Sequence, residues 1–332
     1  MEQKIIAFDL MGTDGGVKPG IDATLTFLKQ NPDYKIVLIG DEVEIKKNLP
    51  ADFNKKQIEI INEKNVAKMK DNNARTLLKE NSSMMSALNL IAENKASSVL
   101  SAGDSGTYLA LATLKLKRIN NVSRAAFMPM IPTLIENKYF LLLDAGANLE
   151  VKPEYFEQWA LISSIFYKFL FKKENPSVGI INIGTEEYKG FEYHKQANEL
   201  LKNNLNVNYK GFIETRDLLQ GNIDIALADG YAGNITLKTM EGTVLNFSKL
   251  MKEKLMKNFF RKIGALILKS AFKEVKERFD YRNVGAAWVI GVNGIVIKSH
   301  GSSDAKAYLG ALNQIKIAIE SQVLTKIIKA LE

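Results

Sequence analysis

Lys189 and Asn234 are the two side chains of this sequence best suited to hold an anion. Lys189 lies in the segment Asn182-Ile-Gly-Thr-Glu-Glu-Tyr-Lys-Gly, close to an expected strand end. A lysine there can place its charge on a phosphate or neutralise a developing oxyanion. Asn234 ends the segment Gly230-Tyr-Ala-Gly-Asn. Each also has a simpler interpretation, as a solvated lysine at a helix start and as an asparagine that caps a helix.

His300 is one of two histidines, and it follows an expected strand. Gly301, Ser302 and Ser303 come next, at the expected start of the C-terminal helix. This setting suits anion contacts and proton transfer, although a lone histidine is more often structural. His194 lies in a polar helical stretch, where we expect it to be solvated. Because the chain has no cysteine and its histidines are so placed, we expect no metal site.

The segment Ser101-Ala-Gly-Asp-Ser-Gly-Thr precedes an expected helix over residues 108–116. Glycine between a strand and a helix exposes backbone N–H groups where the helix dipole favours an anion. The alternative is a tight turn that needs glycine only for its backbone. Neither this segment nor the one after Asp9 has the spacing of a P-loop or a dinucleotide fingerprint, so nucleotide binding has little support. The sequence also lacks the Gly-x-Ser-x-Gly motif of a serine nucleophile.

Short apolar runs alternate with helical patterns along most of the chain. Such runs are typical of strands buried on both faces, and the alternation favours an α/β fold with a mostly parallel, doubly wound sheet. Polar loops follow five of the strands, and the carboxyl ends of parallel strands share one edge, so we expect these loops to form one crevice. The expected strands cover residues 5–9, 35–39, 58–62, 99–102, 139–144, 178–183 and 223–229.

The composition is that of an ordinary globular protein, with 332 residues, 46% hydrophobic and 25% charged. We find no internal repeat or linker and expect a single domain over residues 1–332. The first residues do not resemble a signal peptide, and no apolar run approaches the roughly 20 residues that span a bilayer. We therefore expect a soluble or membrane-surface protein. Without cysteine, any acyl transfer must proceed without a cysteine nucleophile.

The net charge of +8 is concentrated in one stretch, residues 249–278, which holds ten Lys or Arg against three Glu. This concentration argues against a nucleic-acid-binding domain. Over residues 243–280 the apolar spacing predicts an amphipathic helical hairpin, interrupted at Gly264. We expect it to contact an anionic surface such as a membrane; the alternative is a dimer or core helix with its basic residues in water. The contact residues would be Lys257, Phe259, Phe260, Arg261, Lys262, Ile263, Leu266 and Ile267.

A set of motifs in a fixed order covers nearly the whole chain. They are Ile5-Ile-Ala-Phe-Asp-Leu-Met-Gly, Ser101-Ala-Gly, Leu143-Asp-Ala-Gly-Ala-Asn, the Lys189 segment, Gly211-Phe-Ile-Glu-Thr-Arg-Asp, Asp229-Gly-Tyr-Ala-Gly-Asn-Ile-Thr-Leu-Lys-Thr, Gly291-Val-Asn-Gly and His300-Gly-Ser-Ser-Asp-Ala-Lys-Ala. With these motifs the sequence resembles the PlsX family, the bacterial phosphate acyltransferases of glycerophospholipid synthesis.

The resemblance implies a Rossmann-like three-layer α/β/α fold related to isocitrate dehydrogenases and phosphate acetyltransferases, in a homodimer. It implies reversible transfer of a fatty acyl group from acyl carrier protein to inorganic phosphate, and we expect no cofactor. The acyl phosphate would pass to a membrane glycerol-3-phosphate acyltransferase. We therefore expect a cytoplasmic protein that associates peripherally with the membrane.

The resemblance also implies roles for residues. Lys189 and Asn234 would contact phosphate or acyl phosphate. As a separate hypothesis, which the resemblance does not supply, we expect His300 to protonate the leaving thiolate. Further phosphate contacts are expected from Asp9, Gly12, Gly103, Ser105, Gly106, Gly301, Ser302 and Ser303. The sequence departs from the family pattern at Thr13, Asp104 and Trp288. Asp104 would put a negative charge near an anion site, and Trp288 would alter an acyl or dimer contact.

Three other functions remain open. A phosphate acetyltransferase that uses coenzyme A shares the expected architecture. An NAD-dependent decarboxylating dehydrogenase would need a cluster of metal-binding aspartates, which the sequence does not show. A non-catalytic scaffold could organise lipid enzymes through the basic hairpin.

Overall fold

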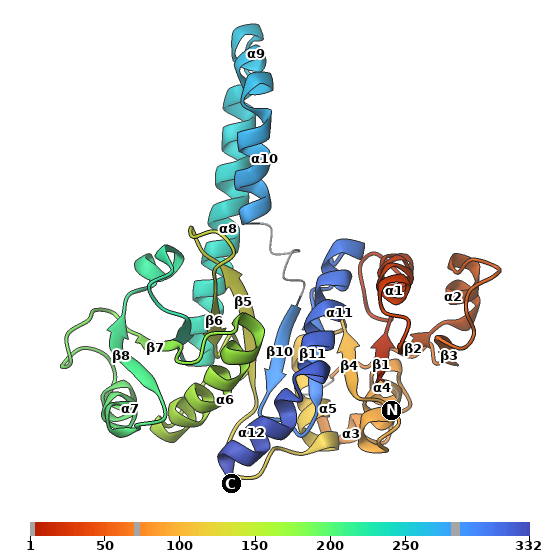
Figure 1. Cartoon of the computed structure of the whole chain (residues 1–332), viewed down its shortest axis with the longest axis horizontal. Helices are drawn as coiled ribbons and strands as arrows, with labels where there is room; N and C mark the ends of the chain where they lie inside the picture. The colour runs from red at the N-terminus through yellow and green to blue at the C-terminus, as the bar shows by residue number, and fades with distance from the viewer. Residues whose placement is uncertain (1–3, 70–73, 280–285) are drawn as a thin grey trace.

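Eleven strands form one sheet in the computed structural model, which describes residues 4–69, 74–279 and 286–332 (Figure 1). The strands lie in the order β3-β2-β1-β4-β11-β10-β5-β6-β9-β7-β8. Their bounds are β1 Lys4–Asp9, β2 Tyr34–Gly40, β3 Ile58–Asn62, β4 Ser98–Ser101, β5 Ala126–Pro132, β6 Tyr139–Leu143, β7 Ser177–Ile181, β8 Asn208–Ile213, β9 Ile225–Leu227, β10 Ala286–Ile290 and β11 Ile295–Ser299.

Helices cover both faces of this sheet, which gives the expected three-layer α/β/α architecture (Figure 1). Their bounds are α1 Lys18–Gln30, α2 Glu42–Asn48, α3 Ala74–Leu77, α4 Ser83–Ala92, α5 Ser105–Leu116, α6 Pro153–Phe171, α7 Glu192–Asn203, η1 Thr215–Gln220, α8 Gly230–Leu255, α9 Phe259–Ile267, α10 Lys269–Arg278, α11 Ala305–Glu320 and α12 Val323–Leu331.

Successive side chains of a strand point to opposite faces, so each strand contributes to two cores. In β1, Ile6 and Phe8 pack with α1 and α11, whereas Ala7 packs with α4 and α5. In β6, Leu141 and Leu143 join the first of these cores, and the residues between and before them pack against α8. Burial on both faces explains why these strands are continuous apolar runs.

All seven strands expected from apolar runs are present, and so is the strand before His300. Seven of the ten strand pairings among the described residues are parallel. The antiparallel ones all lie in the middle of the sheet, between β11 and β10, β10 and β5, and β5 and β6. The sheet is therefore built from two parallel blocks that run in opposite directions.

The expectation that five polar loops share one edge is wrong, because the two blocks reverse direction. The loops after β1 and β4 lie at one edge, and the loops after β6, β7 and β9 lie at the other. The two sets of strand ends still come close along β5. Lys298 of β11 pairs with Ala287 of β10, which in turn pairs with Pro129 of β5. Asp144, which follows β6, accepts a hydrogen bond from the N–H of Phe127, two residues before Pro129 on β5. Two residues of a strand span about 7 Å.

Helices α8, α9 and α10 project from the sheet as a hairpin (Figure 1). With 26 residues, α8 is about 39 Å long, so it covers the sheet face at its start and extends beyond it. The expected interruption at Gly264 is wrong, since Gly264 lies inside α9. The chain instead breaks before α9, where the Asn258 side chain accepts a hydrogen bond from Arg261 N and caps the helix. Residue 280, the expected end, lies outside the described residues.

Among the helices of the described ranges, none combines the length and the apolar character needed to cross a bilayer.

Candidate active site

Three loops meet at the carboxyl ends of the adjacent strands β1, β4 and β11. Under them lies Asp9, which is buried and accepts hydrogen bonds from Ser101 Oγ at 2.7 Å and from Met11 N at 3.1 Å. Burial raises the pKa of Asp9, although these hydrogen bonds oppose the shift. Asp9 therefore acts as a buried acceptor that ties the first two loops together.

The expected glycines and serines surround this junction. Asp14 N donates to Gly301 O at 2.9 Å, which joins the first loop to the loop after β11. Ser303 is buried and its Oγ lies 2.8 Å from Ser299 Oγ, while Ser302 Oγ lies 2.8 Å from His300 Nδ1. Gly12 has a φ of +71° and packs on Gly103. The first helical turn of α5 adds Ser105 and Gly106.

Asp104 caps the N-terminus of α5. Its Oδ1 accepts hydrogen bonds from Thr107 N at 2.8 Å and from Thr107 Oγ1 at 2.7 Å. Burial would raise the pKa of Asp104, but the two hydrogen bonds outweigh it and lower the pKa. The carboxylate thus occupies part of the position where this helix end would hold a phosphate.

The start of α8 interlocks with the loop after β6. Asp229 caps the helix by accepting from Tyr231 N and Ala232 N. The helix approaches so closely that a Cβ on Gly233 would lie 1.9 Å from Asp144 O. Gly146 has a φ of +122°, and a Cβ there would lie 3.3 Å from Asn234 Cγ. Both glycines allow Asn234 to approach the loop after β6. Because α8 begins at Gly230 with Asp229 as its cap, the interpretation of Asn234 as a helix cap is wrong.

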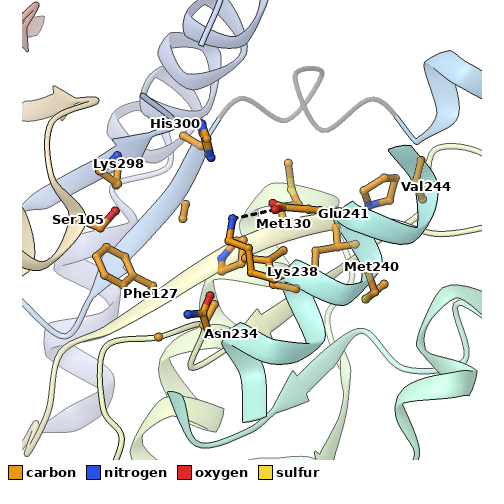
Figure 2. Close-up of a pocket in the computed structure, with 18 of the residues that line it drawn as sticks. Ser105, Phe127, Met130, Asn234, Lys238, Met240, Glu241, Val244, Lys298 and His300 are labelled. Atoms are coloured by element: carbon orange, nitrogen blue, oxygen red, sulfur yellow. Dashed lines mark hydrogen bonds and ion pairs between the residues drawn. The ribbon is translucent and has the colours of Figure 1, made fainter. Parts of the chain in front are cut away.

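A pocket of about 410 Å³ lies over β5 and β10, between the loop after β11 and α8 (Figure 2). One wall is apolar and comes mainly from β5 and α8, and the opposite end is polar. The apolar wall includes Phe127, Pro129, Met130, Ile131, Leu237, Met240, Val244 and Leu245. The polar end consists of Ser105, Asn234, Lys238, Glu241, Lys298, Ser299 and His300.

Lys298 is 8% exposed, and its Nζ donates to the carbonyl oxygens of Ala102, at 3.3 Å, and Ser299. Burial lowers the pKa of Lys298 to about 8, although Asp104 and Asp9 oppose the shift. The pKa of His300 is also lowered, first by partial desolvation and then by the charges of Lys238 and Lys298. The polar end of the pocket therefore has a positive electrostatic potential.

Three of the lining residues, Ser105, Asn234 and His300, were expected from the sequence. Lys238, Glu241 and Lys298 were not. A lone lysine at the end of the apolar run Ile295-Val-Ile-Lys-Ser was a usable signal, because a charge in a buried strand needs a reason. Lys238 lies within the motif that begins at Asp229, which was a usable signal, although no role was assigned to it. Glu241 carries no signal, since charges three residues apart are common on helix surfaces.

The structure does not bring Lys189 to this pocket. Lys189 follows β7 and its Nζ pairs with Glu186 at 2.8 Å, a contact that raises the lysine pKa. Five strand spacings separate β7 from β11, or roughly 24 Å at about 4.8 Å per spacing. A phosphate contact by Lys189 stays a prediction.

Two expectations about single residues are wrong. His194 is buried rather than solvated, and it packs on Phe156 and Tyr193 with Nε2 4.0 Å from Asp229 Oδ2. Trp288 is buried in the core, with its ring 4.9 Å from that of Phe166, and neither faces the pocket nor reaches the surface. The alternation within β10 explains this, because Ala287 faces the pocket and its neighbour points the other way.

The hairpin exposes the apolar residues expected for a contact surface. Phe260 is 83% exposed and Ile267 is 76% exposed. Basic side chains at Lys257, Arg261 and Lys262 are exposed beside them. This part of the hairpin is therefore not a core helix of the single chain, and that interpretation is wrong. A dimer contact through these residues stays a prediction.

The fold of this chain is similar to that of solved phosphotransacetylases. A phosphotransacetylase from Streptococcus pyogenes superposes with a TM-score of 0.63 over 96% of this chain and 94% of its own, at 16% identity, which is a likeness of fold. A family model described as "Fatty acid synthesis protein" matches residues 5–326.

Two curated relatives are named phosphate acyltransferase. The one from Mycoplasma mobile is 54% identical over 97% of this chain and 98% of its own length. The one from Mycoplasmopsis pulmonis is 53% identical over 99% of this chain and all of its own. The chain belongs to the PlsX-type phosphate acyltransferase family. It is an acyltransferase of lipid synthesis with phosphate as a substrate.

Proposed function

We propose that this chain transfers a fatty acyl group reversibly from acyl carrier protein to inorganic phosphate, for glycerophospholipid synthesis. Family membership supports phosphate as the acceptor. The observation that carries the proposal is the pocket, in which a long apolar wall meets a cationic end. A fatty acyl chain would lie along the apolar wall, and phosphate would bind at the cationic end.

The reaction that this pocket would support is direct attack, without an acyl-enzyme. An oxygen of hydrogen phosphate attacks the thioester carbonyl carbon, and a C–O bond forms as the C–S bond breaks. The products are acyl phosphate and a thiolate, which takes up the proton that hydrogen phosphate loses. Neither a cysteine nor a serine-elbow motif is present in the sequence to form a covalent intermediate.

The pocket residues have distinct roles in this scheme. Asn234 would orient the phosphate or the thioester carbonyl, and the cationic end would stabilise the oxyanion. His300 would carry the proton to the leaving thiolate; its lowered pKa keeps it largely neutral at pH 7, able to accept a proton before donating it. Lys189 was expected to hold phosphate in position for attack, but it pairs with Glu186 and is not among the residues that line the pocket.

The hairpin is the proposed contact for an anionic membrane surface. Its exposed phenylalanines and isoleucines lie among lysines and arginines, and Val244, Leu245 and Phe279 at its base also line the pocket. A lipophilic acyl phosphate would leave the pocket at the base of the hairpin whose tip contacts the membrane, toward a membrane glycerol-3-phosphate acyltransferase. The same basic surface also suits contact with the acidic acyl carrier protein. We further propose that two copies of this chain form a homodimer.

The test is phosphate-dependent loss of the thioester from a long-chain acyl carrier protein, with acetyl-CoA as the alternative donor. We expect acyl phosphate from the carrier substrate and little from acetyl-CoA. Asn234→Ala should reduce the rate, and Lys189→Ala tests the more distant residue. Turnover of acetyl-CoA alone would replace the proposal with a phosphate acetyltransferase. A radiolabelled acyl group trapped covalently on the protein would contradict direct attack.

A further inference from the structure

Lys298 and Lys238 lie on opposite walls of the polar end of the pocket. Lys298 is at the end of β11, and Lys238 is on α8 with its amino group directed toward the wall that carries His300 (Figure 2). Each lysine lowers the pKa of His300, so both charges act on the same small space. Two ammonium groups that face each other repel, and an anion between them is stabilised by both.

Neutral carbonyl groups hold the ammonium of Lys298. Its Nζ donates to Ala102 O and Ser299 O, neither of which carries a charge. Burial lowers the pKa of Lys298 even though Asp104 and Asp9 favour its charge, so a further anion that accepts from the third ammonium proton would stabilise it. The chemistry of this wall therefore favours an anionic ligand with several acceptor oxygens.

Glu241 is the partner of Lys238 on the opposite wall. It lies three residues later on α8, and its Oε2 lies 2.8 Å from Lys238 Nζ. Such pairs on a half-exposed helix surface are weak. A dianion that contacts Lys298 at the same time can compete with this single carboxylate.

We propose that Lys238 and Lys298 are phosphate-binding residues, and that phosphate replaces Glu241 as the partner of Lys238. The inference rests on the proposed function, in which phosphate is the acceptor. With phosphate between the two lysines and near Asn234, the apolar wall of β5 and α8 is left for the acyl chain. Glu241 holds the Lys238 side chain in place and sets the affinity for phosphate by competing with it.

The experiment measures KM for phosphate and for a long-chain acyl carrier protein in parallel. Lys238→Met should raise KM for phosphate by about tenfold or more, since it removes a charge-assisted hydrogen bond, and should leave KM for the acyl donor unchanged. Lys238→Arg should keep most of the phosphate affinity. Glu241→Gln should lower KM for phosphate by about two- to fivefold, because the competing carboxylate is gone.

Lys47→Met is the matched control, because Lys47 pairs with Glu44 three residues away on the exposed helix α2. If Lys238→Met and Lys47→Met had the same KM for phosphate, the inference would be overturned while the proposed function stood. If the native chain formed no acyl phosphate, the proposed function would fail instead. Calorimetric titration with inorganic phosphate alone would then decide: weaker binding by Lys238→Met supports the site, and equal binding overturns it.

Discussion

Lys298 is a charged side chain buried at the polar end of the pocket, and its titration would make phosphate binding depend on pH. Burial lowers its pKa from 10.5 to about 8, so Lys298 loses its charge as the pH rises through about 8. If Lys298 binds phosphate, kcat/KM for phosphate should fall over the same range, and a profile between about pH 6.5 and 9.5 measures this. Lys298→Arg keeps its charge at high pH and should remove the fall. A profile of Lys298→Arg identical to that of the native chain would contradict the assignment.

The same shift affects stability. The unfolded chain binds the Lys298 proton more tightly than the folded chain does, so folding carries a cost below pH 8. The contribution of Lys298 to the free energy of unfolding should therefore increase as the pH rises from about 8 toward 10.5. Denaturant unfolding of the native chain and of Lys298→Met across this range measures the effect, and the difference between the two chains should stop changing with pH above about pH 10.5.

At the scale of single residues, the sequence predicted three of the seven polar residues of the pocket. Motif residues such as Asn234 and His300 stand next to glycines at element boundaries, where a polar side chain is noticeable. Lys238 and Glu241 sit inside a helix with many other charges, and only the packing of α8 on the sheet gives them a role. Side-chain type alone cannot separate them from surface charges.

At the scale of elements, α8 positions the pocket because its first turns pack directly on the loop after β6. Gly233→Ala would place a Cβ 1.9 Å from Asp144 O, where only backbone movement can make room. We expect the free energy of unfolding to fall by about 1–3 kcal/mol, and activity to fall with it, since Asn234 and Lys238 move.

Gly242→Ala in the same helix is the matched control. A Cβ at Gly242 meets no atom within 4 Å, and alanine favours a helix over glycine. Gly242→Ala should therefore raise the free energy of unfolding by about 0.5–1 kcal/mol. Urea unfolding of both variants measures the pair, and equal destabilisation would show that the close approach of α8 is not what holds it in place.

The strands that the sequence did not predict explain why the direction of the sheet was wrong. β5 contains Pro129 and Pro132, and proline is unusual inside a central strand. β8 lies at the edge of the sheet and mixes polar with apolar residues, and β10 begins with two alanines, which favour strands weakly. The chain direction reverses at β5 and β10, between the two parallel blocks. Because neither strand was predicted, the sequence carried no sign of this reversal, and all five loops were expected at one edge.

At the scale of the whole molecule, the pocket uses the first part of α8 and the proposed membrane contact uses α9, so substitutions can separate membrane contact from chemistry. Phe260→Ser with Ile267→Ser removes two exposed apolar side chains far from the polar end of the pocket. We expect binding to vesicles that contain anionic lipid to fall by about tenfold or more. Turnover of a short-chain acyl donor, measured without detergent or vesicles, should stay within about twofold of the native rate.

The control for this comparison is Leu205→Ser, because Leu205 is 98% exposed but lies outside the hairpin. Vesicle flotation at low salt distinguishes the variants, and added salt should weaken the native interaction because the hairpin is basic. Equal vesicle binding by the double variant and by Leu205→Ser would reject the hairpin as the membrane contact. The size of the native particle in the same buffer tests the homodimer.

In the proposed reaction, the acyl chain lies along the apolar wall of the pocket between β5 and α8. The direct measurement is the rate of acyl phosphate formation by Val244→Trp, with a long-chain and a butyryl acyl carrier protein as donors. Because Val244 lines this wall, the larger ring should reduce the long-chain rate by about tenfold or more and leave the butyryl rate within about twofold. An equal change with both donors, or no change with either, would contradict the placement of the acyl chain in this pocket.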